Sequence, residues 1–350
     1  MFHNMAYLAT IIFIVGFWLH YPGAYPKIYT DIVDVIWTRI PLYDKMIPYV
    51  DYNLEYPALS GVLIYAASIW RELYTYYYII SLVSYFSMLV SLYIVYEVLK
   101  ETGKSFDSIA YYLIFAPSFL FFSIYSFDWF GIMFLLLSLF FASKRKALRS
   151  GLFMGLSVSA RLIPLVCAPF IIKEYSRQRD RLLFILTAFL SWLSTNVYFM
   201  IMNFEGFIYP YMYQLSWVAE DSWLNLIPTY YRSVSGMLYF WIICLILFRK
   251  KKRFSLFESS FLALLGFVLV SYKFPPQYMI LLLPFFALYP SNYMLFITSN
   301  LLNVMIIFWW FSPTFNFGNP WSVNSPVQWV AIVRQLLLLP IFINFFRRKI

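Results

Sequence analysis

The sequence predicts an all-α polytopic membrane protein of about 11 to 13 membrane-inserted helices, with a large first extracytoplasmic loop that carries short interfacial helices. Hydrophobic residues make up 62% of the 350 residues and charged residues only 12%, whereas a soluble domain carries about 25% charged residues. Apolar runs recur along the whole chain. Aromatic residues reach 23%, and tyrosines gather near the ends of the runs, as side chains at headgroup level do. We therefore expect a single membrane domain over residues 1–350.

The apolar runs define the expected membrane segments. They cover residues 5–20, 76–98, 107–124, 128–143, 150–172, 181–201, 234–248, 256–272, 277–290, 292–311 and 328–346. Several are shorter than the roughly 20 residues that cross the hydrocarbon core, so we expect tilted, partly buried or re-entrant segments among them. The first run has no basic region before it and no small-residue cleavage site after it, which favours a retained helix over a signal peptide.

Basic residues predict the orientation of the chain. Five clusters hold 18 of the 26 Lys and Arg residues: Lys100 with Lys104, residues 144–149, residues 173–181, residues 249–253 and residues 347–349. Such clusters mark cytoplasmic loops. This orientation puts three loops outside, at about 21–75, 202–233 and 312–327. In the first loop, the apolar stretch from Ala58 to Trp70 is too short to span and predicts an interfacial helix.

The run at about 150–172 has basic clusters on both flanks, so we expect it to enter and leave the membrane on one side. Pro164 removes a backbone donor and disfavours helix in the residue before it. We therefore predict a re-entrant hairpin with Arg161 at its turn. Irregular backbone at this depth is tolerated only inside protein or beside a wet cavity.

Several function classes lack sequence support. The basic residues lie between apolar runs, which indicates a lipid bilayer as the partner and no nucleic acid. His3 and His20 are the only histidines and lack nearby soft ligands, so no metal cofactor is expected. The sequence has no Walker loop and no G-x-G-x-x-G fingerprint.

Acidic residues of the first outer loop are candidates for chemistry. Asp31 and Asp34 would share one face if this stretch is helical, and Glu55-Tyr56 follows near the end of the loop. A carboxylate at an apolar boundary can have a raised pKa, which suits a general base. The alternative is a set of solvated loop charges with a helix cap at Thr30 or Asp31.

Further candidates lie beside or within apolar runs. Asp128 begins one run and is either a site residue or a helix cap. Arg161 at membrane depth is a functional hypothesis by default, its alternative being a partner for backbone carbonyls. Lys273, Gln277 and Tyr278 flank a proline pair and present a cation, an amide and a phenol; their alternative is an ordinary interfacial loop.

Taken together, these segments resemble the GT-C superfamily of integral-membrane glycosyltransferases, in particular GPI mannosyltransferase I and related prokaryotic polyprenyl-phosphate-mannose-dependent mannosyltransferases. The resemblance rests on the order and rough spacing of five motifs over most of the chain: Tyr29-Thr30-Asp31-Ile32, Glu55-Tyr56-Pro57-Ala58-Leu59, Phe127-Asp128-Trp129-Phe130-Gly131, Gly151 to Pro169 with Arg161, and Pro276-Gln277-Tyr278.

The resemblance implies an enzyme that takes a hexose, most often mannose, from a polyprenyl or dolichyl phosphate to a glycolipid or glycan acceptor. It implies Asp31 or Asp34 as the catalytic carboxylate, on the extracytoplasmic face of a multi-pass membrane protein. A prokaryotic plasma membrane is favoured over the endoplasmic reticulum. The family tends to separate its two acids by one residue, whereas Asp31 and Asp34 are separated by two. The base assignment and any D-x-D metal role are therefore open.

The donor side of such a site needs cations that neutralise a leaving lipid phosphate. The candidates are Arg161, Lys273, Arg232 and Arg39. A competing hypothesis is a secondary transporter or lipid flippase, favoured by Arg161 and the broken helix at Pro164. The long acidic outer loop disfavours it, because carriers place polar residues near the midplane. A third hypothesis, a non-catalytic membrane subunit, has no positive sequence feature.

Overall fold

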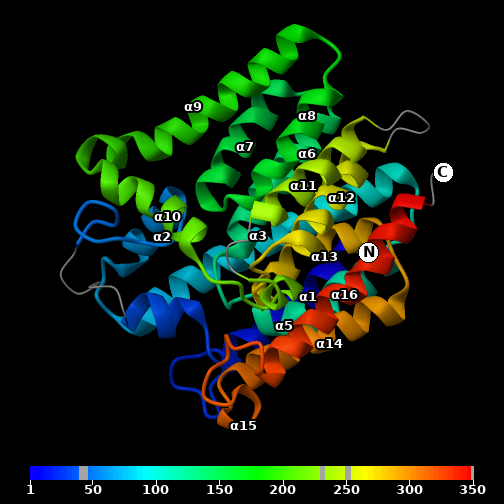
Figure 1. Cartoon of the computed structure of the whole chain (residues 1–350). Helices are drawn as coiled ribbons and strands as arrows, with labels where there is room; N and C mark the ends of the chain where they lie inside the picture. The colour runs from blue at the N-terminus through cyan, green and yellow to red at the C-terminus, as the bar shows by residue number, and fades with distance from the viewer. Residues whose placement is uncertain (39–45, 229–232, 249–253, 348–350) are drawn as a thin grey trace. The chain divides into compact units, whose positions relative to one another are not determined.

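A computed structural model of the chain describes residues 1–38, 46–228, 233–248 and 254–347. Over these residues the regular structure is helical (Figure 1), and the β-type pairing consists of two isolated bridges, Pro48 with Tyr52 and Glu220 with Lys273. The all-α prediction is confirmed for the described part of the chain.

The chain divides into two compact units. The first unit, Met1–Lys104 with Phe122–Ser216, contains α1 (Phe2–Leu19), η1 (Asp31–Trp37), α2 (Ala58–Ser68), α3 (Leu73–Thr102), α6 (Asp128–Ser143), α7 (Ala147–Ala160), η4 (Ile163–Cys167), α8 (Ala168–Glu174), α9 (Gln178–Met202) and α10 (Phe204–Ser216). The second unit, Ser105–Phe121 with Trp217–Ile350, contains α4 (Asp107–Ile109), η3 (Ala110–Ile114), η5 (Trp223–Leu226), α11 (Ser233–Leu247), α12 (Leu256–Val270), η7 (Pro276–Tyr278), α13 (Met279–Leu288), α14 (Tyr293–Trp310), α15 (Pro313–Asn316) and α16 (Pro326–Arg347). Helix α5 (Pro117–Phe122) ends at the sequence boundary between them. The single-domain organisation stays a prediction.

Five described helices are long and apolar enough to cross a membrane: α1, α3, α9, α14 and α16. Shorter apolar helices, among them α2, α6 and α12, accompany them. This supports a multi-pass membrane protein, whereas the full number of 11 to 13 inserted helices stays a prediction. All ten residues of α13 are buried. A helix that is apolar on every side and only about 15 Å long belongs to the interior of a bundle.

In the first unit, α7 packs between α6 and α9. Gly151 and Gly155 are one helical turn apart and let the backbones approach. A Cβ at Gly151 would lie 1.9 Å from Thr187 Oγ1, and one at Gly155 would lie 2.4 Å from the Ala188 carbonyl oxygen. Small residues spaced in this way are typical of close helix pairs in membranes. Any larger residue at either position would force α7 away from α9.

Helix α7 ends at a break. Arg161 has an extended backbone, and the chain continues through η4 and α8. The two flanks of the segment meet, because Arg145 Nη2, before α7, lies 3.0 Å from Glu174 Oε1 at the end of α8. The segment therefore turns back on itself, with Arg161 between its two arms. Whether this hairpin is re-entrant in a membrane stays a prediction.

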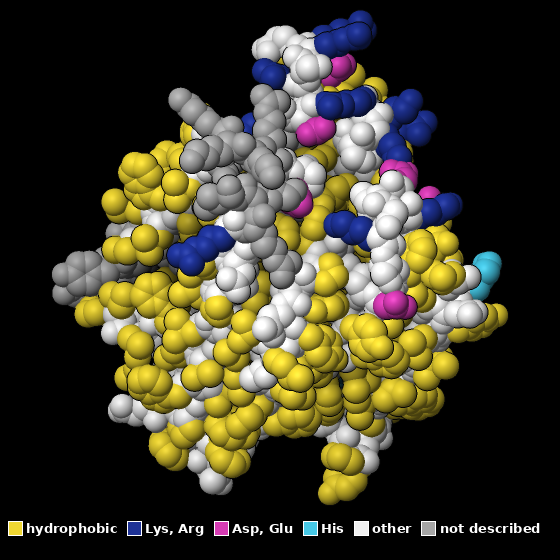
Figure 2. All heavy atoms as spheres, turned by 90° about the vertical axis from the view of Figure 1, so that its right-hand side faces the viewer, with side chains coloured by type: hydrophobic (Ala, Val, Ile, Leu, Met, Phe, Trp, Pro, Cys, Tyr) yellow, Lys and Arg dark blue, Asp and Glu magenta, His cyan; other side chains and the backbone are white. Residues whose placement is uncertain are grey.

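The basic clusters of the first unit gather where the two flanks of this hairpin meet. Lys144 pairs with Glu101, which joins the cluster after α3 to the one after α6, and the Arg145–Glu174 pair joins the latter to the cluster after α8. In the face of the whole chain that Figure 2 draws, Lys and Arg side chains lie in the upper half of the view, and hydrophobic side chains cover most of the lower half. Clustering at one end agrees with the orientation expected from the positive-inside rule.

Candidate functional site

Asp31 begins η1, a short π-helix at the head of the first predicted outer loop. Thr30 fixes this start, because its hydroxyl donates to the carbonyl oxygens of Ile124 and Tyr125, at 3.0 Å each. The amide of Asp31 donates to the Tyr125 carbonyl oxygen at 3.0 Å. The loop is thus tied to residues just before α6, nearly a hundred positions later in the chain. This contact places Asp31 near the start of α6.

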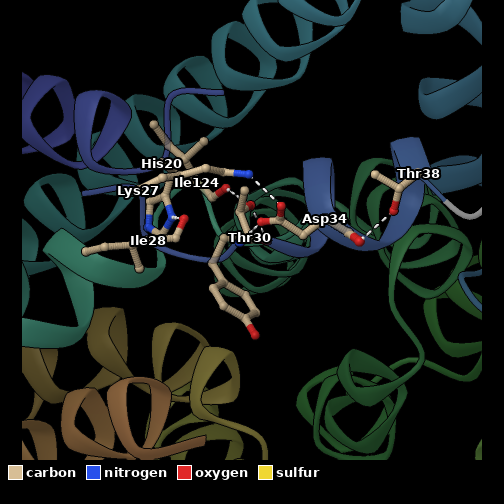
Figure 3. A network of polar contacts seen from close by, with 8 residues as sticks. His20, Lys27, Ile28, Thr30, Asp34, Thr38 and Ile124 are labelled. Atoms are coloured by element: carbon tan, nitrogen blue, oxygen red, sulfur yellow. Dashed lines mark hydrogen bonds and ion pairs between the residues drawn. The ribbon is translucent and has the colours of Figure 1, made fainter. Parts of the chain in front are cut away.

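Asp34 lies one helical turn further on and is held on both of its carboxylate oxygens (Figure 3). Lys27 Nζ lies 2.5 Å from Oδ1, and the amide of Thr30 donates to Oδ2 at 2.9 Å. The Asp34 carbonyl also accepts from the Thr38 hydroxyl at 2.7 Å. Asp34 therefore pairs with Lys27 and satisfies the Thr30 amide at the start of η1. Asp31 and Asp34 contact different partners, although the sequence suggested that they share one face.

Arg161 and Asp128 form a largely buried ion pair. Arg161 Nη2 lies 2.6 Å from Asp128 Oδ1, and their side chains are 16% and 8% exposed. The same nitrogen donates to Ser126 Oγ at 2.8 Å. Gly131, one turn into α6, leaves room for the arginine, because a Cβ there would lie 2.8 Å from Arg161 Cγ. Among the described residues, the buried Oδ2 atom of Asp128 has no hydrogen-bond partner, so it can accept a hydrogen bond from a ligand.

Tyr56 joins the two parts of this cluster. Its hydroxyl donates to Asp31 Oδ2 at 3.2 Å, and the guanidinium carbon of Arg161 lies 5.3 Å from the centroid of its ring. Such a position over an aromatic face is favourable for a cation. We name the group Asp31, Glu55, Tyr56, Ser126, Asp128 and Arg161 the Asp31 cluster.

The electrostatics of the Asp31 cluster favour a proton acceptor. The pKa of Asp31 is raised from 3.8 to about 7. Burial and the nearby Glu55 carboxylate raise it, and Arg161 and the hydrogen bonds from Tyr29 and Tyr56 act in the opposite direction. A carboxyl with a pKa near the working pH can both take up and release a proton. The arrangement can therefore remove a proton from a hydroxyl beside a fixed cation.

The Asp31 cluster brings together five residues that the sequence singled out, from separate parts of the chain: Asp31, Glu55, Tyr56, Asp128 and Arg161. Asp34 lies on the same turn but is engaged elsewhere. Arg39 and Arg232 lie outside the described residues. Within the described residues, no group of three or more His, Cys, Asp or Glu side chains is placed to hold a metal ion.

Lys273, Gln277 and Tyr278 belong to the second unit. Lys273 Nζ lies 3.8 Å from the centroid of the Trp217 ring. The backbone of Phe274 donates to the Glu220 carbonyl at 3.0 Å, and the Glu220 amide donates to the Tyr272 carbonyl at 2.9 Å. Lys273 is therefore packed on an aromatic face next to an acidic residue. Gln277 and Tyr278 form part of η7.

The second unit also contains a buried polar network that was not predicted from the sequence. Arg334, in α16, is fully buried. It donates to Asn303 Oδ1 at 2.6 Å, to the Asp221 carbonyl at 2.9 Å and to the Phe274 carbonyl. Gln328, two turns earlier on α16, accepts from the Asp221 amide at 3.1 Å. We name Asp221, Asn303, Gln328 and Arg334 the Arg334 network.

A signal for the Arg334 network was present in the sequence. Arg334 interrupts the apolar run at 328–346, and Gln328 and Gln335 are seven positions apart, which puts them on one helix face. A charged residue with two amides inside an apolar run indicates a polar interior face.

The geometry thus gives two polar centres, one in each unit. In the Asp31 cluster, a titratable carboxylate lies beside a partly accessible cation. Comparisons of this chain with models of protein families, with curated proteins and with solved structures give no match.

Proposed function

We propose that the protein is an inverting glycosyltransferase that acts at the extracytoplasmic face of a membrane. It moves a hexose, mannose in the first instance, from a polyprenyl or dolichyl phosphate to a lipid-linked or cell-surface glycan acceptor. The observation that carries the proposal is the Asp31 cluster, in which a carboxylate with a pKa near 7 lies beside the Arg161–Asp128 pair.

The acceptor side of the reaction needs a base. In a single displacement, the Asp31 carboxylate takes the proton of the acceptor hydroxyl while the hydroxyl oxygen bonds to the anomeric carbon. The bond from that carbon to the phosphate oxygen breaks, and the lipid phosphate leaves with the electron pair. One carboxylate is sufficient for such an inverting transfer, because no covalent enzyme intermediate forms.

The donor side needs positive charge where the phosphate leaves. Arg161 supplies a planar guanidinium that can bond two phosphate oxygens. Its pairing with Asp128 fixes the direction of the fork, and preorganised charge of this kind stabilises a leaving group without reorganisation during the reaction. Because the side chain keeps 16% exposure, an anionic headgroup can approach it.

Donor consumption tests the proposal. Purified protein is incubated with polyprenyl phosphates that carry radiolabelled mannose, glucose or galactose, together with a lipid extract as the acceptor source. We expect the label to pass from one donor to a product, and Asp31→Asn to abolish this transfer. Asp51→Asn is the matched control, because Asp51 lies in the same loop, is exposed and caps the amide of Ile47 at 2.7 Å. Activity retained in Asp31→Asn would contradict the assigned chemistry.

A transporter or lipid flippase is the second candidate, and Arg334 is the observation that favours it. A fully buried arginine in a helix long enough to span a membrane, bonded to Asn303 of another such helix, is a common feature of transport pathways. Proteoliposomes separate the two candidates. A carrier moves labelled lipid-linked sugar across the bilayer without breaking the sugar–phosphate bond, whereas a transferase consumes the donor.

A further inference from the structure

Tyr56 occupies the position between the proposed base and the proposed cation. Its hydroxyl lies 3.2 Å from Asp31 Oδ2, and its ring faces the Arg161 guanidinium at 5.3 Å. We propose that Tyr56 is a positioning residue, which fixes the Asp31 carboxylate and the Arg161 guanidinium relative to one another. This proposal rests on the proposed function and assigns Tyr56 a role other than sugar binding.

The surroundings of Tyr56 hold it firmly. Its ring packs against Phe127 in a T-shaped arrangement with centroids 5.2 Å apart, and its carbonyl oxygen accepts from the Tyr49 hydroxyl at 2.6 Å. Tyr49 in turn packs against Gly61, where a Cβ would lie only 2.3 Å from the Tyr49 hydroxyl. Side chain and backbone of Tyr56 are therefore both restrained, so the phenol cannot swing away from Asp31 without displacing its neighbours.

The direction of the hydrogen bond is also defined. Burial raises the pKa of Tyr56 well above its usual value, so the phenol keeps its proton and can only donate to the carboxylate. The titratable and charged groups that face Asp31 are Glu55, Arg161, Tyr29 and Tyr56. Lys27 and Asp34 pair with each other on the adjoining turn. Tyr56 contacts both Asp31 and Arg161.

A positioning role predicts a shift that a merely structural role would not give. The hydrogen bond from Tyr56 lowers the pKa of Asp31, and the charge of Glu55 raises it. Tyr56→Phe removes the hydroxyl and keeps the ring on Arg161 and Phe127. The acidic limb of the pH–rate profile should then move to higher pH by about one unit, because a hydrogen bond to a charged group has about that effect. Glu55→Gln should move the limb to lower pH.

The kinetic constants sharpen the test. We expect Tyr56→Phe to lower kcat about tenfold at neutral pH and to leave the KM for the donor unchanged, since the Arg161–Asp128 pair remains. Tyr49→Phe, which loosens the Tyr56 backbone and leaves its hydroxyl in place, should shift the limb in the same direction by a smaller amount. It keeps the proposal testable if Tyr56→Phe does not fold.

A second measurement separates this proposal from the proposed function. Carboxyl ¹³C-labelled aspartate, with Asp31→Asn to assign the signal, reports the titration of Asp31 whether or not a donor is turned over. An Asp31 titration that is unchanged in both Tyr56→Phe and Tyr49→Phe overturns the positioning role, even in an active enzyme. A wild-type protein that consumes no donor, but in which Tyr56→Phe raises the Asp31 titration midpoint, contradicts the transferase and supports the link from Tyr56 to Asp31.

Discussion

Arg161 and Arg334 both lie among apolar helices, but their guanidinium groups bind different kinds of partner. Arg161 pairs with the Asp128 carboxylate and the Ser126 hydroxyl and keeps 16% exposure. Arg334 is fully buried and bonds two backbone carbonyls and an amide oxygen. Side-chain partners near a surface can be shared with a ligand, whereas buried carbonyls have no other donor to replace the one they lose. We therefore assign Arg161 to binding and Arg334 to structure.

The largest expected effect is on folding, at Arg334. Arg334→Met keeps much of the side-chain volume but leaves the carbonyls of Asp221 and Phe274 without this donor. Leaving a buried acceptor unpaired costs about 1–3 kcal/mol, and Arg334 serves several acceptors, so we expect a clear fall in the unfolding temperature in detergent. Arg161→Met is the matched control, and we expect a smaller fall because the Arg161 side chain keeps 16% exposure, whereas Arg334 is fully buried. Equal losses of stability in the two variants would contradict the assignment of Arg334 to structure and Arg161 to binding.

The next effect is on turnover, at Asp31. Asp31→Asn keeps the shape of the side chain and removes its proton affinity, so we expect a 10²–10⁴-fold loss of rate with donor binding nearly intact. Asp34→Asn should lose less than tenfold in rate and some stability, because Asp34 is paired with Lys27 and Thr30. Initial rates and donor affinity for both variants decide the assignment. The reverse ranking would make Asp34 the base.

A smaller effect on turnover is expected when the planar guanidinium of Arg161 is replaced by another cation. Arg161→Lys preserves the charge but replaces the planar fork with a single point of contact. We expect about a tenfold loss of kcat/KM in Arg161→Lys and about 10²-fold or more in Arg161→Gln, without a matching loss of stability. Steady-state kinetics beside thermal unfolding would show both. A fully active, stably inserted Arg161→Gln protein would exclude a role on the donor phosphate.

Most members of the Asp31 cluster could be predicted from the sequence, because they are charged or polar residues within or next to apolar runs. A lone arginine before a proline in an apolar run, and an aspartate that opens an apolar segment, both lack solvent and need partners. Their pairing is a matter of three-dimensional packing, so the sequence could name Arg161 and Asp128 but not join them. The roles of Asp31 and Asp34 also depended on the path of the loop, which brings Lys27 back onto Asp34.

The Arg334 network was missed for a different physical reason. Reading residues 328–346 as one membrane-crossing run treats the helix as lipid-exposed, whereas one of its faces is buried against polar groups from η5, α14 and the segment before η7. Several of those groups lie in loops, and the path of a loop cannot be predicted from the periodicity of its sequence. The coarse helical fold was predictable, since apolar periodicity is a local property, but the partners of a buried polar face were not.

The last expected effect is a pH dependence of stability, and it separates the two centres once more. Burial raises the pKa of Asp221 from 3.8 to about 8, with Glu220 adding to the rise and Arg334 and Lys273 opposing it. Between about pH 4 and pH 8, the unfolded chain therefore releases a proton that the folded protein keeps. Stability from this group is fully present below about pH 4 and is lost as the pH rises to about 8.

Asp221→Asn should remove this slope, so that the unfolding temperatures of variant and wild type draw together at low pH and diverge in favour of the variant near pH 8. Asparagine suits the site because residue 221 has a φ of 54°, a conformation that asparagine tolerates. Asp31→Asn should flatten the curve in the same direction only up to about pH 7, and its main effect should remain on turnover. Parallel curves for wild type and Asp221→Asn across this range would show that Asp221 is ionised in the folded protein, paired with Arg334 as a permanent charge.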